Sequence, residues 1–252
     1  MKFAVIIPAR WASSRFPGKP LAKLGGVEVI NRVVARVRQA GLNSLVATDD
    51  ERIFQCVTNA GGTAIMTRAD HVCGTDRVRE AAEALPADID VIINVQGDEP
   101  FIHPDQLQAL MQVFENHPDT DIATLIRPLP SDTPYSTLSD PALVKAVITD
   151  DGRALYFSRF PIPYQRGIDP EQWAERHTYF AHIGIYAYRA EVLRRITDMP
   201  VSPLEKSESL EQLRWLQAGL TIRTAMSRHV GVGIDTPKDL AAAEALLAKQ
   251  NG

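Results

Sequence analysis

Three cations lie within ten residues of one another, directly after a short apolar segment near the start of the chain. Arg10, Arg15 and Lys19 follow the run Phe3–Ile7, and small residues separate them. Guanidinium and ammonium groups donate to the non-bridging oxygens of phosphates, so this segment suits a polyphosphate. It matches neither the G-x-x-x-x-G-K-S/T phosphate loop nor the G-x-G-x-x-G dinucleotide turn. The alternative is that the segment is a solvated surface loop. The position of the segment directly after a predicted strand disfavours this alternative.

Two aspartates occupy positions where they could meet those phosphates. Asp98 follows the apolar run Val91–Val95, and Asp235 stands two residues before Pro237. A carboxylate facing a phosphate needs a divalent cation between them, and Mg²⁺ takes one or two carboxylates together with phosphate oxygens. The alternative is structural: Asp235 could cap the final helix, and Asp98 could cap a turn before Pro100.

The polar segment Thr67–Arg77 follows another predicted strand. Within it, Gly74 permits close approach of the backbone to a ligand. Thr75 can cap the next helix or offer its hydroxyl to a nucleotide base. On spacing alone, a turn followed by a helix cap is equally compatible with these residues.

The second half of the chain offers a polar strand face and a polar helix face. Along the predicted strand Ala181–Tyr188, alternation places His182 and Tyr186 on one side. Glu208 and Gln212 lie four residues apart on a predicted helix, hence on one face, where they could receive hydroxyl groups. Arg159, just past a predicted strand, would suit a carboxylate. A half-buried histidine and a solvated helix face are the structural alternatives.

The elements that must position these residues alternate between short apolar runs and segments with helical spacing. This pattern predicts a doubly wound, mostly parallel α/β sheet covered on both faces, which binds ligands beyond the carboxyl ends of its strands. A smaller β-rich lobe is expected at about residues 140–190, within a single domain over residues 1–252. Predicted strands are Phe3–Ile7, Ser44–Thr48, Thr63–Met66, Val91–Val95, Ile122–Ile126, Leu143–Thr149, Ala154–Phe157 and Ala181–Tyr188. Predicted helices are Val29–Ala40, Glu51–Ala60, Thr75–Leu85, Pro104–Asn116, Ser207–Ala218 and Pro237–Lys249.

Composition narrows the class of protein further. The chain has 252 residues and a net charge of −4, which argues against a general nucleic-acid binder. We expect no membrane segment, because no apolar run approaches ~18–20 residues. We expect no signal peptide, because Pro8 ends the first apolar run too early. Cys56 and Cys73 lack metal-ligand spacing and are expected as reduced thiols, so a cytoplasmic location is predicted.

Short blocks of sequence spread over about residues 5 to 240 carry these candidates in a fixed order. The blocks are Ile6–Arg10, Arg15–Leu21, Val46–Asp49, Met66–His71, Gly74–Thr75, Asn94–Pro100, Ala154–Arg159, His182–Tyr186, Ser202–Glu205, Leu210–Arg214 and Gly233–Pro237. The first block is typical of nucleotidyltransferases broadly. The whole series closely resembles the 3-deoxy-manno-octulosonate (Kdo) cytidylyltransferase family.

The resemblance implies a nucleotidyltransferase that moves CMP from CTP to the anomeric hydroxyl of Kdo, releases pyrophosphate and serves lipopolysaccharide biosynthesis. It also implies Mg²⁺, a homodimer and no covalent enzyme intermediate. By resemblance the catalytic residues are Arg10, Arg15, Lys19 and Asp98, and the metal ligands are Asp98 and Asp235. The residues implied for CTP are Ala9, Arg10, Lys19, Arg68, Gly74, Thr75 and Gln96. Those implied for the sugar are Arg15, Gln96, Arg159, His182, Tyr186, Glu208 and Gln212.

Other functions compete with this one. The segment Lys206–Ser209 departs from the family pattern beside the implied sugar contacts. An amino-substituted relative, 8-amino-Kdo, or another acidic sugar such as a sialic acid therefore stays open as acceptor. A nucleotide-sensing regulatory protein is the non-enzyme alternative, although it would not need a pair of metal-binding aspartates. The missing G-x-G-x-x-G turn makes a nicotinamide dehydrogenase the weakest candidate.

Overall fold

The first strand, β1 (Phe3–Ala9), is buried on both of its faces. Val5, Ile6 and Ile7 are successive residues that point to alternate sides, and each is at most 1% exposed. Such a strand must lie inside a sheet with helices on both sides, as its continuous apolar sequence predicts. The computed structural model describes residues 1–13, 15–71, 73–231 and 233–251.

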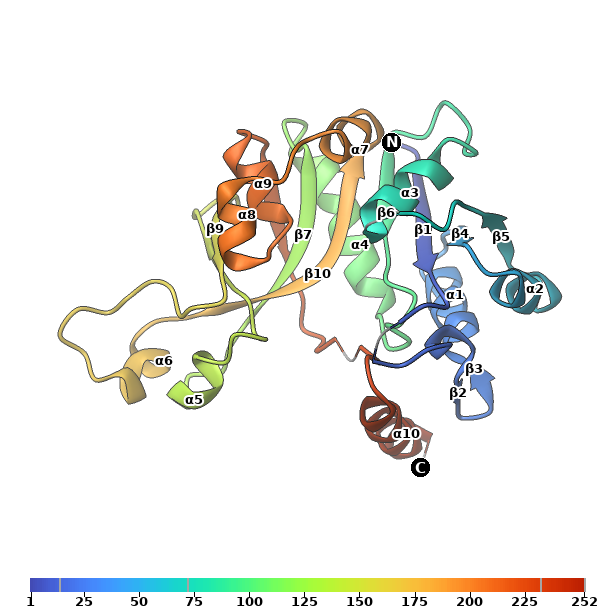
Figure 1. Ribbon diagram of the computed structural model, residues 1–252. Helices are drawn as coiled ribbons and strands as arrows, with labels where there is room; N and C mark the ends of the chain where they lie inside the picture. Colours follow the sequence, from blue (N-terminus) through green and yellow to red (C-terminus); the bar gives the residue numbers. More distant parts are fainter. Residues whose placement is uncertain (14, 72, 232, 252) are drawn as a thin grey trace. The chain divides into compact units, whose positions relative to one another are not determined.

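The chain divides into two units, which are described in turn (Figure 1). The first unit comprises Met1–Gln108, Arg189–Thr197 and Gly231–Gly252, and the second comprises Ala109–Tyr188 and Asp198–Val230.

The first unit contains a parallel sheet in the order β6-β1-β4-β5. Ile6 pairs with Leu45 of β4 on one side and with Asn94 of β6 on the other. The strands that join β1 in this sheet are β4 (Ser44–Thr48), β5 (Thr63–Met66) and β6 (Val91–Asn94). The helices that follow or flank them are α1 (Val29–Gln39), α2 (Glu51–Asn59), α3 (Gly74–Ala82) and α7 (Ala190–Thr197).

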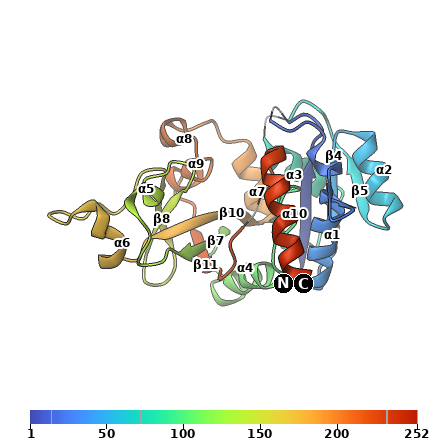
Figure 2. The same ribbon diagram turned by 90° about the horizontal axis from the view of Figure 1, so that it is seen from below.

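A smaller apolar cluster joins the two ends of the first unit's chain. It contains Leu24 and Val29 near the start, and Ile234 and Ala243 near the end. The last helix, α10 (Pro237–Asn251), which is the long red helix in Figure 2, thereby packs on the segment after β1. The elements of that segment are η1 (Lys19–Leu21), β2 (Lys23–Leu24) and β3 (Val27–Glu28). This packing carries Asp235 toward the carboxyl end of β1.

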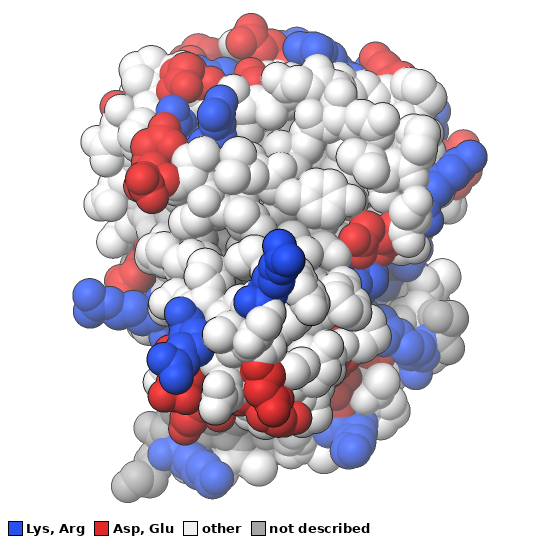
Figure 3. All heavy atoms as spheres, turned by 90° about the vertical axis from the view of Figure 1, so that its left-hand side faces the viewer, with Lys and Arg blue, Asp and Glu red and all other residues white. Residues whose placement is uncertain are grey.

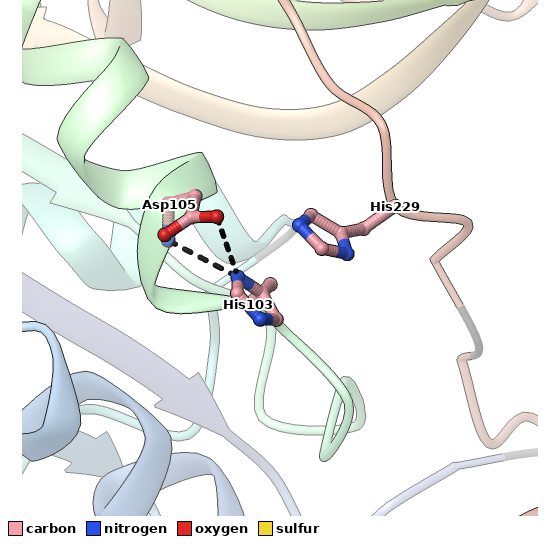
Figure 4. A group of neighbouring side chains, drawn as sticks. All are labelled: His103, Asp105 and His229. Atoms are coloured by element: carbon pink, nitrogen blue, oxygen red, sulfur yellow. Dashed lines mark hydrogen bonds and ion pairs between the residues drawn. The ribbon is translucent and has the colours of Figure 1, made fainter.

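Helix α4 (Pro104–Asn116) begins with a well-formed cap (Figure 4). The backbone N–H of His103 donates to Gln106 Oε1 at 2.9 Å, and the N–H of Asp105 donates to His103 Nδ1 at 3.3 Å. His103 Nδ1 also lies 3.3 Å from Asp105 Oδ2. These contacts satisfy N–H groups that a helix start leaves without intrahelical partners, and Pro104 lacks an N–H to satisfy.

The second unit is richer in antiparallel strands. β11 pairs with β7 in parallel, whereas β7 with β10, β10 with β8 and β8 with β9 are antiparallel. Its strands are β7 (Ile122–Pro128), β8 (Lys145–Ile148), β9 (Ala154–Ser158), β10 (Phe180–Arg189) and β11 (Ile222–Met226). Its helices are α5 (Tyr135–Leu138), η2 (Pro170–Gln172), α6 (Trp173–Arg176), α8 (Pro203–Glu208) and α9 (Gln212–Gln217).

Strand β10 contains an irregularity beside its polar residues. Ile183 pairs with Leu125, but the next pair along the ladder is Tyr186 with Thr124, so two residues of β10 are inserted. Because two residues restore the alternation that one would invert, His182 and Tyr186 stay on the same face. Their ring centroids lie 5.4 Å apart, which confirms the predicted shared face.

The predicted helix Ser207–Ala218 is wrong. Ser209 adopts a left-handed backbone with φ of 52° and ends α8, and α9 begins only at Gln212. The signal for the true start lies in Ser202 and Glu205, which form a capping box ahead of α8. Glu208 and Gln212 therefore belong to different helices rather than to one helix face.

The predicted fold class is confirmed. The first unit is the doubly wound parallel sheet, and the second holds the β-rich lobe with β8, β9 and part of β10. Missing from the prediction were α7 and β11, together with the short elements. Among the residues that the structure describes, no helix combines the length and apolar character needed to cross a bilayer.

Candidate active site

A cleft of about 250 Å³ opens at the carboxyl ends of β1 and β6, in the first unit. It brings together seven of the residues proposed above from the sequence. These are Ala9, Arg10, Lys19, Gly74, Gln96, Asp98 and Asp235. The cleft therefore lies where the sequence argument expects a ligand site, beyond the carboxyl ends of parallel strands.

Lys19 is the central charge of the cleft. Its ammonium donates to Asp98 Oδ2 and, at 3.1 Å, to Asp235 Oδ1. Burial lowers the pKa of Lys19, but the charges and hydrogen bonds of Asp98 and Asp235 outweigh burial and raise that pKa above its ordinary value. Arg15 Nη2 contacts Asp235 Oδ2 at 3.0 Å, so a second cation reaches the same carboxylate.

Backbone contacts hold the two aspartates at this place. The N–H of Ile234 donates to the carbonyl oxygen of Asp98 at 2.9 Å, which fixes Asp235 beside Asp98. A Cβ atom at Gly97 would lie 2.8 Å from the carbonyl oxygen of Pro8, closer than side chains tolerate. Glycine at position 97 therefore lets the loop after β6 approach the end of β1.

The carboxylates fit a hard divalent cation. One ammonium nitrogen reaches both Asp98 and Asp235, so a single positive charge placed nearby can contact both. Burial, and next the charges of Asp98 and Asp235, raise the pKa of the neighbouring Glu99 to about 7. Asp98 and Asp235 share one ammonium, and Mg²⁺, an oxygen-preferring ion, would neutralise the negative charge that these two carboxylates and the neighbouring Glu99 bring together.

Two further cleft residues, His71 and Arg77, lacked a proposed role in the sequence. The guanidinium of Arg77 is buried and donates to Asp49 Oδ2 at 2.8 Å, to the carbonyl oxygen of Arg68 at 3.2 Å and to Thr67 Oγ1. His71 Nε2 contacts Glu80 Oε2. The position of Arg77, three residues after Gly74 and thus on the same face of α3, is the signal that could have identified it.

Some proposed CTP residues lie outside the lining of the cleft. The side chain of Arg68 is 71% exposed, contacts Asp70 at 3.4 Å and Glu80 at 3.6 Å, and lines a separate charged cavity. Thr75 is buried as the second residue of α3, whose N-cap is Cys73, so the alternative that Thr75 caps this helix is wrong. Arg15 reaches the cleft through Asp235.

Arg159 forms the centre of a second polar group, in the second unit. Its guanidinium donates to three carbonyl oxygens, those of Glu208 at 2.6 Å, Pro141 at 2.8 Å and Ser209 at 3.1 Å. Glu208 in turn accepts from Ser158 Oγ at 2.7 Å and from the Arg159 N–H at 2.9 Å. Arg159 and Glu208 are thus directly joined, although by a different local structure from the single helix predicted.

Lys145 supports the polar group around Arg159 through contacts to its backbone. Its buried ammonium donates to the carbonyl oxygens of Asp140, Leu143 and Arg159, and its side chain belongs to the interior of the second unit. Burial lowers the pKa of Lys145 to about 8. Three converging carbonyl groups fix the backbone on which Arg159 stands.

His182 and Tyr186 belong to an aromatic cluster in the same unit. His182 Nε2 lies 2.9 Å from Thr124 Oγ1, and Tyr186 packs edge-on against Trp215, with ring centroids 5.2 Å apart. Burial lowers the pKa of His182 to about 3, so its imidazole is neutral at physiological pH. Gln212, the first residue of α9, is also buried, and it precedes Trp215 by three residues in the same helix.

The depressed pKa of His182 predicts a pH dependence of stability. Its pKa is about 3 in the fold and 6.5 ordinarily, so the unfolded chain binds the proton first. Stability is complete above pH 6.5 and falls as the pH drops toward 3, by up to about 1.4 kcal/mol per pH unit from this group. Urea unfolding at pH 7, 6 and 5 should give His182→Gln a shallower fall than the wild type. The exposed His177→Gln is the control; equal slopes for His182→Gln and wild type would contradict the assignment.

Comparison with known proteins now defines the class. Residues 4–222 match the family model described as cytidylyltransferase. Over all of both chains, this sequence is 51% identical to a 3-deoxy-manno-octulosonate cytidylyltransferase of Bacteroides thetaiotaomicron. It is 44% identical to one of Escherichia coli, over 99% of this chain and 97% of the relative.

A solved structure agrees with these relatives. The structure of a CMP:2-keto-3-deoxy-manno-octonic acid synthetase in complex with CTP superposes with a TM-score of 0.90 and 43% identity, over 99% of this chain and 100% of that one. The chain belongs to the cytidylyltransferases and, within them, to the 3-deoxy-manno-octulosonate cytidylyltransferase family.

Proposed function

We propose that this chain activates Kdo: it transfers CMP from CTP to the anomeric hydroxyl of the sugar and releases pyrophosphate, for lipopolysaccharide biosynthesis. The observation that carries the proposal is Lys19, whose ammonium joins Asp98 and Asp235 in the cleft at the end of β1. Together with Arg10, it gives that cleft both the cations that a triphosphate requires and the paired carboxylates that a metal requires.

In this proposal the chain acts by positioning and electrostatics. Arg10, Arg15 and Lys19 bind the triphosphate and stabilise the charge that grows on the phosphoryl oxygens and the departing pyrophosphate. Asp98 and Asp235 would hold Mg²⁺. When bound, Mg²⁺ would neutralise phosphate charge and lower the pKa of the attacking hydroxyl. On CTP binding, Lys19 exchanges its carboxylate partners for phosphate oxygens, which frees both aspartates for the metal.

The remaining roles divide between the base and the sugar. We assign Ala9, Gly74 and Gln96 to CTP because they line the cleft, and keep Arg68 and Thr75, which lie outside its lining, as proposed contributors. Arg159, His182, Tyr186, Glu208 and Gln212 are proposed for the sugar, with contributions from Arg15 and Gln96. His182 would act as a neutral hydrogen-bonding group, because its low pKa excludes an imidazolium near pH 7.

We further propose a homodimer. β9 and the segment that leads from it to β10 expose the large apolar side chains of Leu155, Phe160, Tyr164 and Ile168. Figure 3 shows one face of the molecule, on which residues other than Lys, Arg, Asp and Glu cover much of the surface. Exposed apolar groups gathered in one segment are typical of a covered surface. Light scattering should give twice the monomer mass for the wild type and a lower mass for Phe160→Asp; a wild-type monomer would contradict the dimer.

Two further features of the proposal concern the chain as a whole. We propose that residues 1–252 act as one nucleotidyltransferase domain, which is supported by a family match that includes parts of both units. We also propose a cytoplasmic location, consistent with CTP as substrate.

An acceptor panel tests the substrate. Pyrophosphate release from CTP and Mg²⁺ should be measured with Kdo, 8-amino-Kdo and N-acetylneuraminate offered separately. The proposal expects the highest kcat/KM for Kdo, and CTP far above ATP or UTP. A preference for 8-amino-Kdo or the sialic acid would move the chain to that acceptor, while CTP binding without turnover would favour the nucleotide-sensing alternative.

A further inference from the structure

The loop that carries the three cations contains an aromatic contact to a neighbouring helix. The guanidinium carbon of Arg52 lies 3.3 Å from the centroid of the Trp11 ring, in a cation–π arrangement. The same ring lies against Gly18: a Cβ atom there would approach three of its carbon atoms to 2.6–2.9 Å. Any side chain at position 18 would therefore displace the Trp11 ring.

Arg52 is itself held in place. Its Nε and Nη2 donate to the two carboxylate oxygens of Asp50, at 2.9 and 2.6 Å. The Arg52 side-chain hydrogen bonds lower the pKa of Asp50, so this carboxylate stays ionised. Asp50 also accepts from the Arg52 N–H at 2.9 Å as the N-cap of α2. The guanidinium plane that faces Trp11 is thus fixed by a two-point contact to the helix start.

The backbone of Trp11 closes the loop. Its carbonyl oxygen accepts from the N–H of Gly18 at 3.0 Å and from that of Ser13 at 3.0 Å. Gly18 has φ of 73°, a left-handed conformation that favours glycine. The bond from Gly18 joins the two residues that are next to Arg10 and Lys19 in the sequence, because Arg10 precedes Trp11 and Lys19 follows Gly18. Both of these cations line the cleft.

We propose that the contact between Trp11 and Arg52 positions the cation loop, the loop after β1 that carries Arg10, Arg15 and Lys19. The contact keeps this loop in its CTP-binding conformation before CTP arrives. Trp11 and Arg52 act through Arg10 and Lys19, so the inference rests on the proposed triphosphate role of those two residues. If only a fraction of the molecules has the loop in place, the apparent Kd rises by the inverse of that fraction. Once CTP is bound the loop is ordered, so the effect falls on CTP affinity rather than on kcat.

The test compares Arg52→Ala and Trp11→Ala with the wild type. We expect the KM and the directly measured Kd for CTP to rise about three- to thirtyfold, the range of a cation–π contact, with kcat within about twofold. Trp11→Phe should recover most of the affinity, because it keeps an aromatic face. Arg52 is largely exposed, so we expect Arg52→Ala to fold normally. This variant therefore tests the proposal even if Trp11→Ala folds poorly.

The control is Arg38→Ala, an exposed arginine of α1 whose guanidinium donates to a loop carbonyl, that of Gly61. It should leave both kinetic constants and the melting temperature unchanged. An unchanged Kd for CTP in Arg52→Ala and Trp11→Ala would overturn the positioning role, as would a loss confined to kcat. Arg10→Ala separates the two proposals: if it also leaves CTP affinity unchanged, the triphosphate role of the loop fails first.

Discussion

Asp98→Asn should lower kcat by about 10²-fold or more, by analogy with other lost charge-stabilising groups, while the fold survives. The substitution keeps the size of the side chain and removes its charge. Asp98 shares the Lys19 ammonium with Asp235, so the variant retains one carboxylate in the cleft. One carboxylate would hold Mg²⁺ more weakly, and the phosphoryl charge would lose part of its stabilisation.

Steady-state rates at increasing Mg²⁺ separate weaker metal binding from a lost chemical contribution. Partial recovery at high Mg²⁺ indicates the former, and a kcat that stays low indicates the latter. Asp88→Asn, at a mostly exposed aspartate that pairs with Lys2, is the matched control and should keep full activity. Near-normal turnover by Asp98→Asn would remove Asp98 from the metal role.

Arg159→Ala should raise the KM for the sugar by about tenfold or more and leave the KM for CTP unchanged, because a lost contact to a charged group costs about 1.5–3 kcal/mol. The guanidinium has five N–H donors, and the structure shows three of its contacts, all to carbonyl oxygens. The remaining donor capacity can address the carboxylate of the sugar. Lysine at this position would keep the charge and lose the fork, so Arg159→Lys should recover only part of the affinity.

The carbonyl contacts of Arg159 make a structural contribution as well, and the measurement must distinguish the two. Kinetics for both substrates and the melting temperature should be compared with those of Arg153→Ala, an exposed arginine directly before β9, the strand that Arg159 follows. A selective rise in sugar KM supports the binding role. Equal loss for CTP and sugar, together with a lower melting temperature, would make Arg159 structural.

The sequence predicted the parallel strands well for a physical reason. β4 and β5 match their predicted bounds because both are short runs rich in apolar and β-branched residues, and the residues at the end of β4 are buried in the sheet. β11 escaped notice because Arg223 interrupts its apolar pattern. That guanidinium is buried only through contacts to Asp119 at 3.0 Å and Asp151 at 2.9 Å, partners that lie far away in sequence. The helix Ser207–Ala218 failed at Ser209, since a single left-handed residue leaves no periodic signal.

For the candidate site too, the sequence predicted the residues that depend on local position and missed the contacts between distant residues. Convergence of Arg10, Lys19, Asp98 and Asp235 followed from their positions after parallel strands and, for Asp235, from the family resemblance. Sequence spacing could not identify Arg77 as a site residue, because its place in the cleft depends on a contact to Asp49, which is distant in the sequence. Likewise, no local pattern shows that the Lys19 ammonium bridges two carboxylates, or that Trp11 meets Arg52.

The most direct test of the account follows the phosphorus of CTP by NMR spectroscopy during a single reaction with Kdo and Mg²⁺. We expect one phosphodiester-linked CMP–Kdo and one pyrophosphate for each CTP consumed, with no consumption of CTP when Kdo is omitted. Release of free CMP, or loss of CTP without the sugar, would show hydrolysis instead of transfer and would contradict the account.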